Sequence, residues 1–160
     1  MTTPAHPLTE LLSLLDASGD PYVVFDRQYR ILAANSAYRQ KSGVEGVVGR
    51  CCYEVSHGYP VPCDQAGETC PLARSLKSGK LERVLHLHHT PRGEEYVDIE
   101  LAPIRDGSGE IAYFVEKMVG MNQARGLASG QGLVGRSPAF QRMLALVSRV
   151  AKSEAVVLLE

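Results

Sequence analysis

Apolar residues recur with two different periods along the first part of the chain. Leucines at helical spacing mark residues 8–18 and predict an amphipathic helix. Two short apolar runs follow at residues 22–25 and 29–34, and the three polar residues between them predict a β-hairpin. A helix followed by two paired strands therefore opens the fold.

A short helix is expected next, at residues 35–42, because Asn35 is a favourable N-cap residue and Gly43 a favourable C-cap residue. Residues 44–69 contain repeated glycines and prolines, which interrupt regular elements. We therefore expect this segment to be irregular.

Three longer strand patterns follow, at residues 81–89, 95–103 and 111–119, separated by turn-forming residues. In the middle strand apolar residues alternate with acidic ones, which indicates a sheet with one buried face. The chain is thus predicted to have an α+β fold: a five-stranded antiparallel sheet, short helices on one face and an N-terminal amphipathic helix.

The pattern also divides the chain into four parts. Residues 1–19 hold the N-terminal helix, residues 20–120 the α+β domain, and residues 121–132 a linker rich in small and polar side chains. A new helical stripe and then a continuous apolar run fill residues 133–160, which predicts the start of a second domain.

Composition narrows the function classes. The chain has 17 Lys and Arg against 18 Asp and Glu, a formal net charge of −1, and no apolar run of the length that a membrane helix needs. We expect no direct contact with nucleic acid or membrane. The N-terminus lacks the pattern of a secretory signal, so a cytoplasmic protein is expected. In that reducing compartment, cysteines serve metal binding or thiol chemistry more often than structural disulfides.

Four cysteines, with one histidine between them, form the main candidate site: Cys51, Cys52, His57, Cys63 and Cys70. One interpretation is a zinc site formed by all of these except Cys51. The paired C-x2-4-C knuckle of structural zinc sites is missing, however. An iron–sulfur cluster would need similar pairing and ranks below zinc.

The interpretation that we favour is a reactive-thiol sensor. Cys70 precedes Pro71 at a predicted helix start, where the positive end of the helix dipole favours a thiolate. Cys63 lies in the irregular segment and is free to approach a second sulfur. His57 and Cys51 are auxiliary candidates, and Cys51 is expected to point into the core.

Three further histidines, His86, His88 and His89, lie in one predicted strand. His86 and His88 share a face, but the sequence shows no third ligand beside them, so we expect a solvated or half-buried sheet face rather than a metal site.

The order of elements resembles a PAS sensor domain, and "PYVVFDRQYRILAANSAYRQKSG" looks like the opening of one. The final stretch, "GLVGRSPAFQRMLALVSRVAKSEAVVLLE", resembles the first residues of the AAA+ domain of sigma-54-dependent transcription activators. This resemblance implies a regulatory fragment that ends before the phosphate loop and is not an enzyme. The resemblance to PAS domains also implies a homodimer that forms through the N-terminal helix. No cofactor is expected, and a haem or flavin bound in the sheet cavity is the alternative.

The spacing of Cys52, Cys63 and Cys70 is similar to that of the FisR-type members of these activators, which respond to sulfane sulfur. The resemblance implies that these three are the sensing thiols and that the ligand is a persulfide or polysulfide. It further implies that the domain controls its own AAA+ domain and, through it, sigma-54 RNA polymerase and the genes for sulfide oxidation.

Overall fold

The computed structural model describes residues 7–91, 93–120, 137–150 and 156. The helices are α1 (Pro7–Ala17), α2 (Ser36–Ser42), α3 (Cys52–His57), α4 (Pro71–Ser78) and α5 (Pro138–Val150). The strands are β1 (Tyr22–Phe25), β2 (Ile31–Ala34), β3 (Glu82–Thr90), β4 (Gly93–Arg105) and β5 (Ile111–Gly120). The predicted linker at residues 121–132 lies outside the described residues, as does all but Val156 of the apolar run at 155–159.

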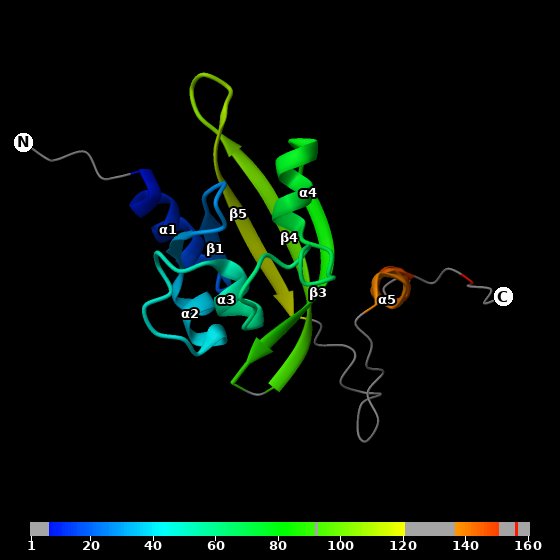
Figure 1. Cartoon of the computed structure of the whole chain (residues 1–160). Coiled ribbons are helices and arrows are strands. Elements are labelled where there is room, and N and C mark those ends of the chain that lie inside the picture. Colours follow the sequence, from blue (N-terminus) through cyan, green and yellow to red (C-terminus); the bar gives the residue numbers. More distant parts are fainter. Residues whose placement is uncertain (1–6, 92, 121–136, 151–155, 157–160) are drawn as a thin grey trace, which may run out of the picture.

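All five strands form one antiparallel sheet in the order β2-β1-β5-β4-β3. The chain leaves β2 at one edge, forms α2, α3 and α4, and enters the sheet again as β3 at the opposite edge. These three helices contact strands of the sheet and cover one of its faces (Figure 1). The α+β prediction is therefore confirmed, and the covered face is where the chain encloses a site.

Buried apolar side chains alternate with more exposed ones along the central strands β4 and β5, so the face of the sheet that the helices cover forms the core. Val97, Ile99 and Leu101 of β4 are fully buried, as the sequence predicts. On β5, Phe114 and Met118 point the same way and are also buried. The residue between them on that face is an acid, Glu116.

Asn35 fixes the beginning of the helical layer. Its side-chain oxygen accepts hydrogen bonds from the backbone N–H groups of Tyr22 and Tyr38, at 2.9 and 3.0 Å. Its amide nitrogen donates to the carbonyl oxygens of Leu15 and Asp20. This one side chain thereby caps α2 and joins it to α1 and β1. Because Asn35 is fully buried, its polar atoms need such partners within the protein.

The helix α3 was not predicted, because six residues are too few to show a helical period. It ends at Gly58, whose φ of 67° suits the left-handed C-cap position. Consequently His57 is the last residue of α3 and faces β3.

The helix α5 contacts β3 at the outer edge of the sheet. Within the described residues no helix is long and apolar enough to cross a membrane.

Candidate functional site

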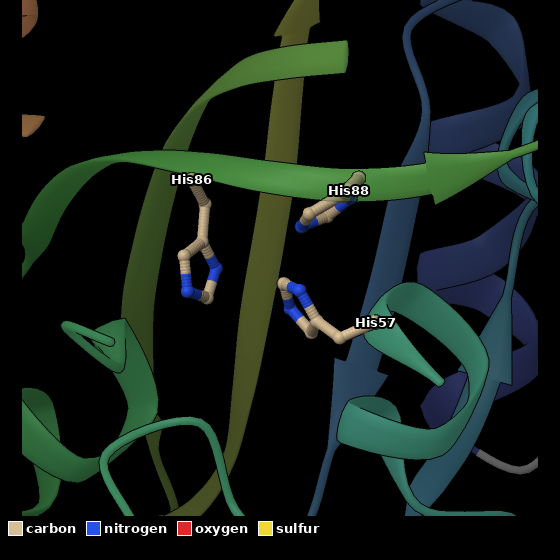
Figure 2. A group of neighbouring side chains, drawn as sticks. All are labelled: His57, His86 and His88. Carbon is tan, nitrogen blue, oxygen red and sulfur yellow. The ribbon is translucent and has the colours of Figure 1, made fainter. Parts of the chain in front are cut away.

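Three buried histidines meet between α3 and β3. His86 and His88 point from β3 toward the helical layer, and His57 points back at them from the end of α3 (Figure 2). The ring centre of His57 lies 4.3 Å from that of His86 and 4.7 Å from that of His88. The exposed fractions are only 3%, 2% and 4%. The prediction of a solvated or half-buried face for His86 and His88 is therefore wrong, because α3 and the following loop cover it.

A hydrogen bond to the backbone defines the tautomer of His57. Its Nδ1 lies 2.8 Å from the carbonyl oxygen of Leu87, which only accepts, so Nδ1–H donates and Nε2 keeps its lone pair. The ring also stacks on Tyr59, with ring centres 5.4 Å apart. Burial, aided by the nearby charge of His86, lowers the pKa of His57 to about 3. His57 is thus a neutral imidazole at neutral pH.

Glu68 supports this group from the irregular segment. Its Oε1 accepts a hydrogen bond of 2.5 Å from the hydroxyl of Tyr59, and its Oε2 lies 3.4 Å from Nε2 of His86. Burial opposes ionisation of this carboxyl, but the adjacent His86 and the hydrogen bond from Tyr59 outweigh it and lower the pKa of Glu68. A buried carboxylate therefore holds one of the three imidazoles.

The three predicted sensing thiols reach the same place from three parts of the chain. Cys52 begins α3, Cys63 lies in the loop between α3 and α4, and Cys70 is the N-cap of α4. All three line one cavity of about 20 Å³, and His57, His86 and His88 line it as well. A space of this size holds about one water-sized group.

Cys63 and Cys70 form a hydrogen-bonded pair. The bond from Cys63 lowers the pKa of Cys70, and the backbone N–H groups of Ala73 and Leu72 add to this effect. The Ala73 nitrogen lies 3.4 Å from Sγ of Cys70, as expected for the N-cap of a helix whose first residue is Pro71. The same bond, together with burial, raises the pKa of the Cys63 thiol. Cys70 is therefore the thiol of the pair that ionises more readily, and Cys63 is its donor.

The adjacent cysteines Cys51 and Cys52 have different surroundings. Cys52 packs against the core and lines the cavity, and burial raises its pKa. Cys51 is the N-cap of α3, is partly exposed and does not line the cavity. The prediction that Cys51 points into the core is wrong, since the cap position leaves it at the edge of the helix.

Glu116 is a further cavity residue that the sequence analysis missed. It lies on β5, is 6% exposed, and faces the three thiols. Burial and the negative charge of Cys70 raise the pKa of Glu116 to about 8, so its carboxyl is protonated at neutral pH. The signal was available, because an acid between Phe114 and Met118 occupies a position that strand alternation assigns to the core.

The predicted zinc set of Cys52, His57, Cys63 and Cys70 does not meet as one group of ligand atoms. Within the part of the chain that the structure describes, the group at ligand spacing is His57, His86 and His88, whose candidate ligand atoms all lie within 4.8 Å of one another. The cavity is also far below the several hundred Å³ that sites for organic cofactors occupy. As folded here, it has no room for haem or flavin.

A comparison with known families decides the fold. The family described as the PAS fold matches residues 15–125, which is most of the chain. The chain belongs to the PAS fold family. Among curated proteins, none matches the sequence.

Solved structures of PAS and light-oxygen-voltage domains are similar to this PAS domain in fold. One, from work titled "Flavin Analogue Sheds Light on Light-Oxygen-Voltage Domain Mechanism", is 16% identical with a TM-score of 0.58, covering 89% of this chain and 96% of its own. The light-oxygen-voltage protein of Rhodobacter sphaeroides is 17% identical with a TM-score of 0.58, covering 73% and 68%. The PAS domain of the fruit-fly ELK potassium channel is 12% identical with a TM-score of 0.56, covering 72% and 98%. The TM-scores establish a shared fold, and at identities this low the comparison shows the fold alone. The chain is accordingly a PAS sensory domain.

Proposed function

We propose that this PAS domain detects sulfane sulfur, as a persulfide or inorganic polysulfide, through Cys52, Cys63 and Cys70. The observation that carries the proposal is the convergence of three thiols on one small cavity, where a hydrogen bond from Cys63 lowers the pKa of Cys70. The thiolate is the form of cysteine that attacks sulfur, and a lowered pKa increases the fraction of thiolate. A second thiol already in contact with it needs little movement to form a bond.

The chemistry runs in two balanced steps. The Cys70 thiolate attacks the terminal sulfur of the polysulfide, an S–S bond forms to Cys70, and the shortened polysulfide leaves with the electron pair and takes up a proton. Cys63 then loses its proton and attacks the Cys70 sulfur, which expels hydrosulfide and closes a disulfide. Two thiols are oxidised and one sulfane sulfur atom is reduced. If Cys63 also carries a persulfide, attack of one persulfide on the other leaves a trisulfide and again releases hydrosulfide.

Cys52 is the entry point in this scheme. Cys63 and Cys70 are 3% and 4% exposed, whereas Cys52 is partly exposed and lines the same cavity. A linear polysulfide reaches the buried pair along the side of Cys52, which also offers an alternative second thiol.

The regulatory output that we propose depends on the elements that a bond between Cys63 and Cys70 would connect. A covalent bond between Cys63 and Cys70 fixes the loop to the N-terminus of α4, which packs on β3 and β4. Strand β3 also contacts α5, the helix in the stretch that resembles the start of an AAA+ domain. We infer that the modified domain alters its restraint on that domain, and so sigma-54-dependent transcription of sulfide-oxidation genes. A bridge that exists in only one state supplies the differential interaction that a switch needs.

Peptide mass spectrometry tests the proposal on the full 160-residue chain. The reduced protein is exposed to inorganic polysulfide, its remaining thiols are alkylated, and each cysteine peptide is identified. We expect a Cys63–Cys70 cross-link with zero or one extra sulfur, which Cys70→Ser abolishes. Cys51→Ser is the matched control and should react like the unmodified chain. Unchanged masses at all three cavity cysteines would reject the proposal.

A further inference from the structure

The imidazoles of His57, His86 and His88 form a second chemical group in the lining of the thiol cavity. They come from two elements that are far apart in sequence and meet only in the fold (Figure 2). Each is more than nine-tenths buried. The ring centres of His86 and His88 lie 4.3 and 4.7 Å from that of His57, and the buried Nε2 of His86 lacks a hydrogen-bond partner among the described residues, an arrangement that gains nothing from packing alone.

We propose that His57, His86 and His88 bind a divalent transition metal of the zinc class, with a fourth coordination position open to the cavity. Three imidazole ligands and one open position make a recognised arrangement for zinc. Imidazole also suits cobalt, nickel and copper, whereas the hard ions magnesium and calcium require oxygen ligands. The proposal is independent of the sulfane-sulfur function, because it uses none of the thiols as a required ligand.

The surroundings of two histidines have the features of an outer coordination shell. Metal-bound histidines usually donate their second N–H to a carboxylate or a backbone carbonyl, which fixes the tautomer and aims the ligand nitrogen. His57 donates Nδ1–H to the carbonyl of Leu87, leaving Nε2 as ligand. His86 holds Nε2 at 3.4 Å from the carboxylate of Glu68, leaving Nδ1 as ligand.

The Glu68 and His86 pair gives a second, independent sign. Oε2 of Glu68 and Nε2 of His86 are fully buried, and neither forms a hydrogen bond of good geometry with any described residue. A slight rotation of the His86 ring would bring Nε2–H onto the carboxylate and turn Nδ1 toward the other two histidines. Tyr59 already anchors the other oxygen of Glu68.

The required movement is small. Candidate ligand atoms lie up to 4.8 Å apart. Zinc–nitrogen bonds of about 2.0–2.1 Å place tetrahedral ligand nitrogens about 3.3 Å apart. The rings must therefore close by up to roughly 1.5 Å, and the adjoining cavity of about 20 Å³ gives them space to do so.

Cobalt(II) and zinc(II) titrations test the site. The untagged 160-residue chain is stripped with a chelator, kept reduced, and titrated with cobalt, whose visible bands report coordination number, and then with zinc in competition. We expect one metal per chain and the intense bands of four-coordinate cobalt. Each of His57→Gln, His86→Gln and His88→Gln should weaken binding by at least about 100-fold, and Glu68→Gln by about 10- to 100-fold.

Two controls keep the outcome decisive. His89→Gln removes an exposed histidine of the same strand and should leave the affinity unchanged. The triple variant Cys52→Ser, Cys63→Ser, Cys70→Ser should still bind one cobalt, because the imidazoles suffice.

Loss of binding in the triple variant with retention in the histidine variants would overturn the proposal in favour of a thiolate site. Absence of stoichiometric binding by the parent chain would overturn it outright. Should a histidine variant fail to fold by circular dichroism, Glu68→Gln and the thiol variant still decide.

Discussion

Two groups of side chains line the buried cavity and differ in the charge that they support: His57, His86 and His88, here the histidine wall, and Cys52, Cys63 and Cys70, here the thiol wall. On the histidine wall, burial lowers the pKa of His57 to about 3, so an imidazole stays neutral. On the thiol wall, the hydrogen bond from Cys63 and two backbone N–H groups lower the pKa of Cys70, so a negative charge is supported. Burial is similar on both sides, and the difference lies in the donors that each wall provides. A PAS fold thus gives two chemistries in one space through the placement of a few hydrogen bonds.

The largest expected effect concerns Glu116, which lies beside the thiol wall. Its folded-state pKa of about 8 lies above the ordinary value of 4.5, so its contribution to stability is fully present below pH 4.5 and is lost as pH rises through 8. We expect Glu116→Gln to remove a decline of about 3 kcal/mol in the free energy of unfolding between pH 5 and pH 8. Urea unfolding at both pH values measures it. An equal decline in the variant would show that Glu116 is already ionised.

The histidine wall should respond to the loss of its anchor. Tyr59→Phe removes the hydrogen bond to the buried carboxylate of Glu68, and we expect a loss of about 2 kcal/mol at pH 7. Thermal and urea unfolding measure the change. Tyr113→Phe, at a position of β5 on the other face from Glu116, is the matched control and should change stability by less than about 0.5 kcal/mol. Equal effects of the two variants would mean that the Glu68 bond contributes nothing specific.

The elements of the fold and the residues of the cavity differ in how far the sequence could predict them. The alternation around Val97 and the caps Asn35 and Gly43 predicted elements correctly, because strand pairing and helix capping are read from neighbouring residues. The chain position of Cys70 before Pro71 likewise placed it at a helix start. Such local signals sufficed for the fold and for one thiol.

The histidine wall could not be predicted in the same way. His57 and His86 meet only because α3 folds over β3, and α3 is bounded by residues that suggested an irregular segment. Glu68 has no local pattern at all, since its partners come from a distant strand and from Tyr59. Sites that depend on long-range contacts need the tertiary structure, whereas Glu116 was open to a stricter use of strand alternation.

On the thiol wall, Cys63→Ala should slow the chemistry of its neighbour. The variant removes the principal donor to the Cys70 thiolate, so the pKa of Cys70 rises toward its ordinary value. We expect alkylation of Cys70 by iodoacetamide at pH 7 to be about tenfold slower, which corresponds to about 1.4 kcal/mol. Site-resolved peptide mass spectrometry over a time course measures the rate. A rate equal to that of the parent chain would assign the activation of Cys70 to the helix N-terminus alone.

The smallest effect is expected at Cys51, the neighbour of a cavity thiol that is not part of the cavity. Its backbone N–H lies 3.4 Å from Oε2 of Glu54, the arrangement of a capping box, and serine is a better N-cap residue than cysteine. Cys51→Ser should therefore leave stability unchanged or raise it by less than about 1 kcal/mol, measured by urea unfolding. Cys52→Ser, one residue away, buries a hydroxyl beside Glu116 and should lower stability instead. The two changes in the free energy of unfolding would then have opposite signs, because Cys51 caps α3 and Cys52 is its first residue. A loss of stability at Cys51 as large as that at Cys52 would instead place both thiols in the core.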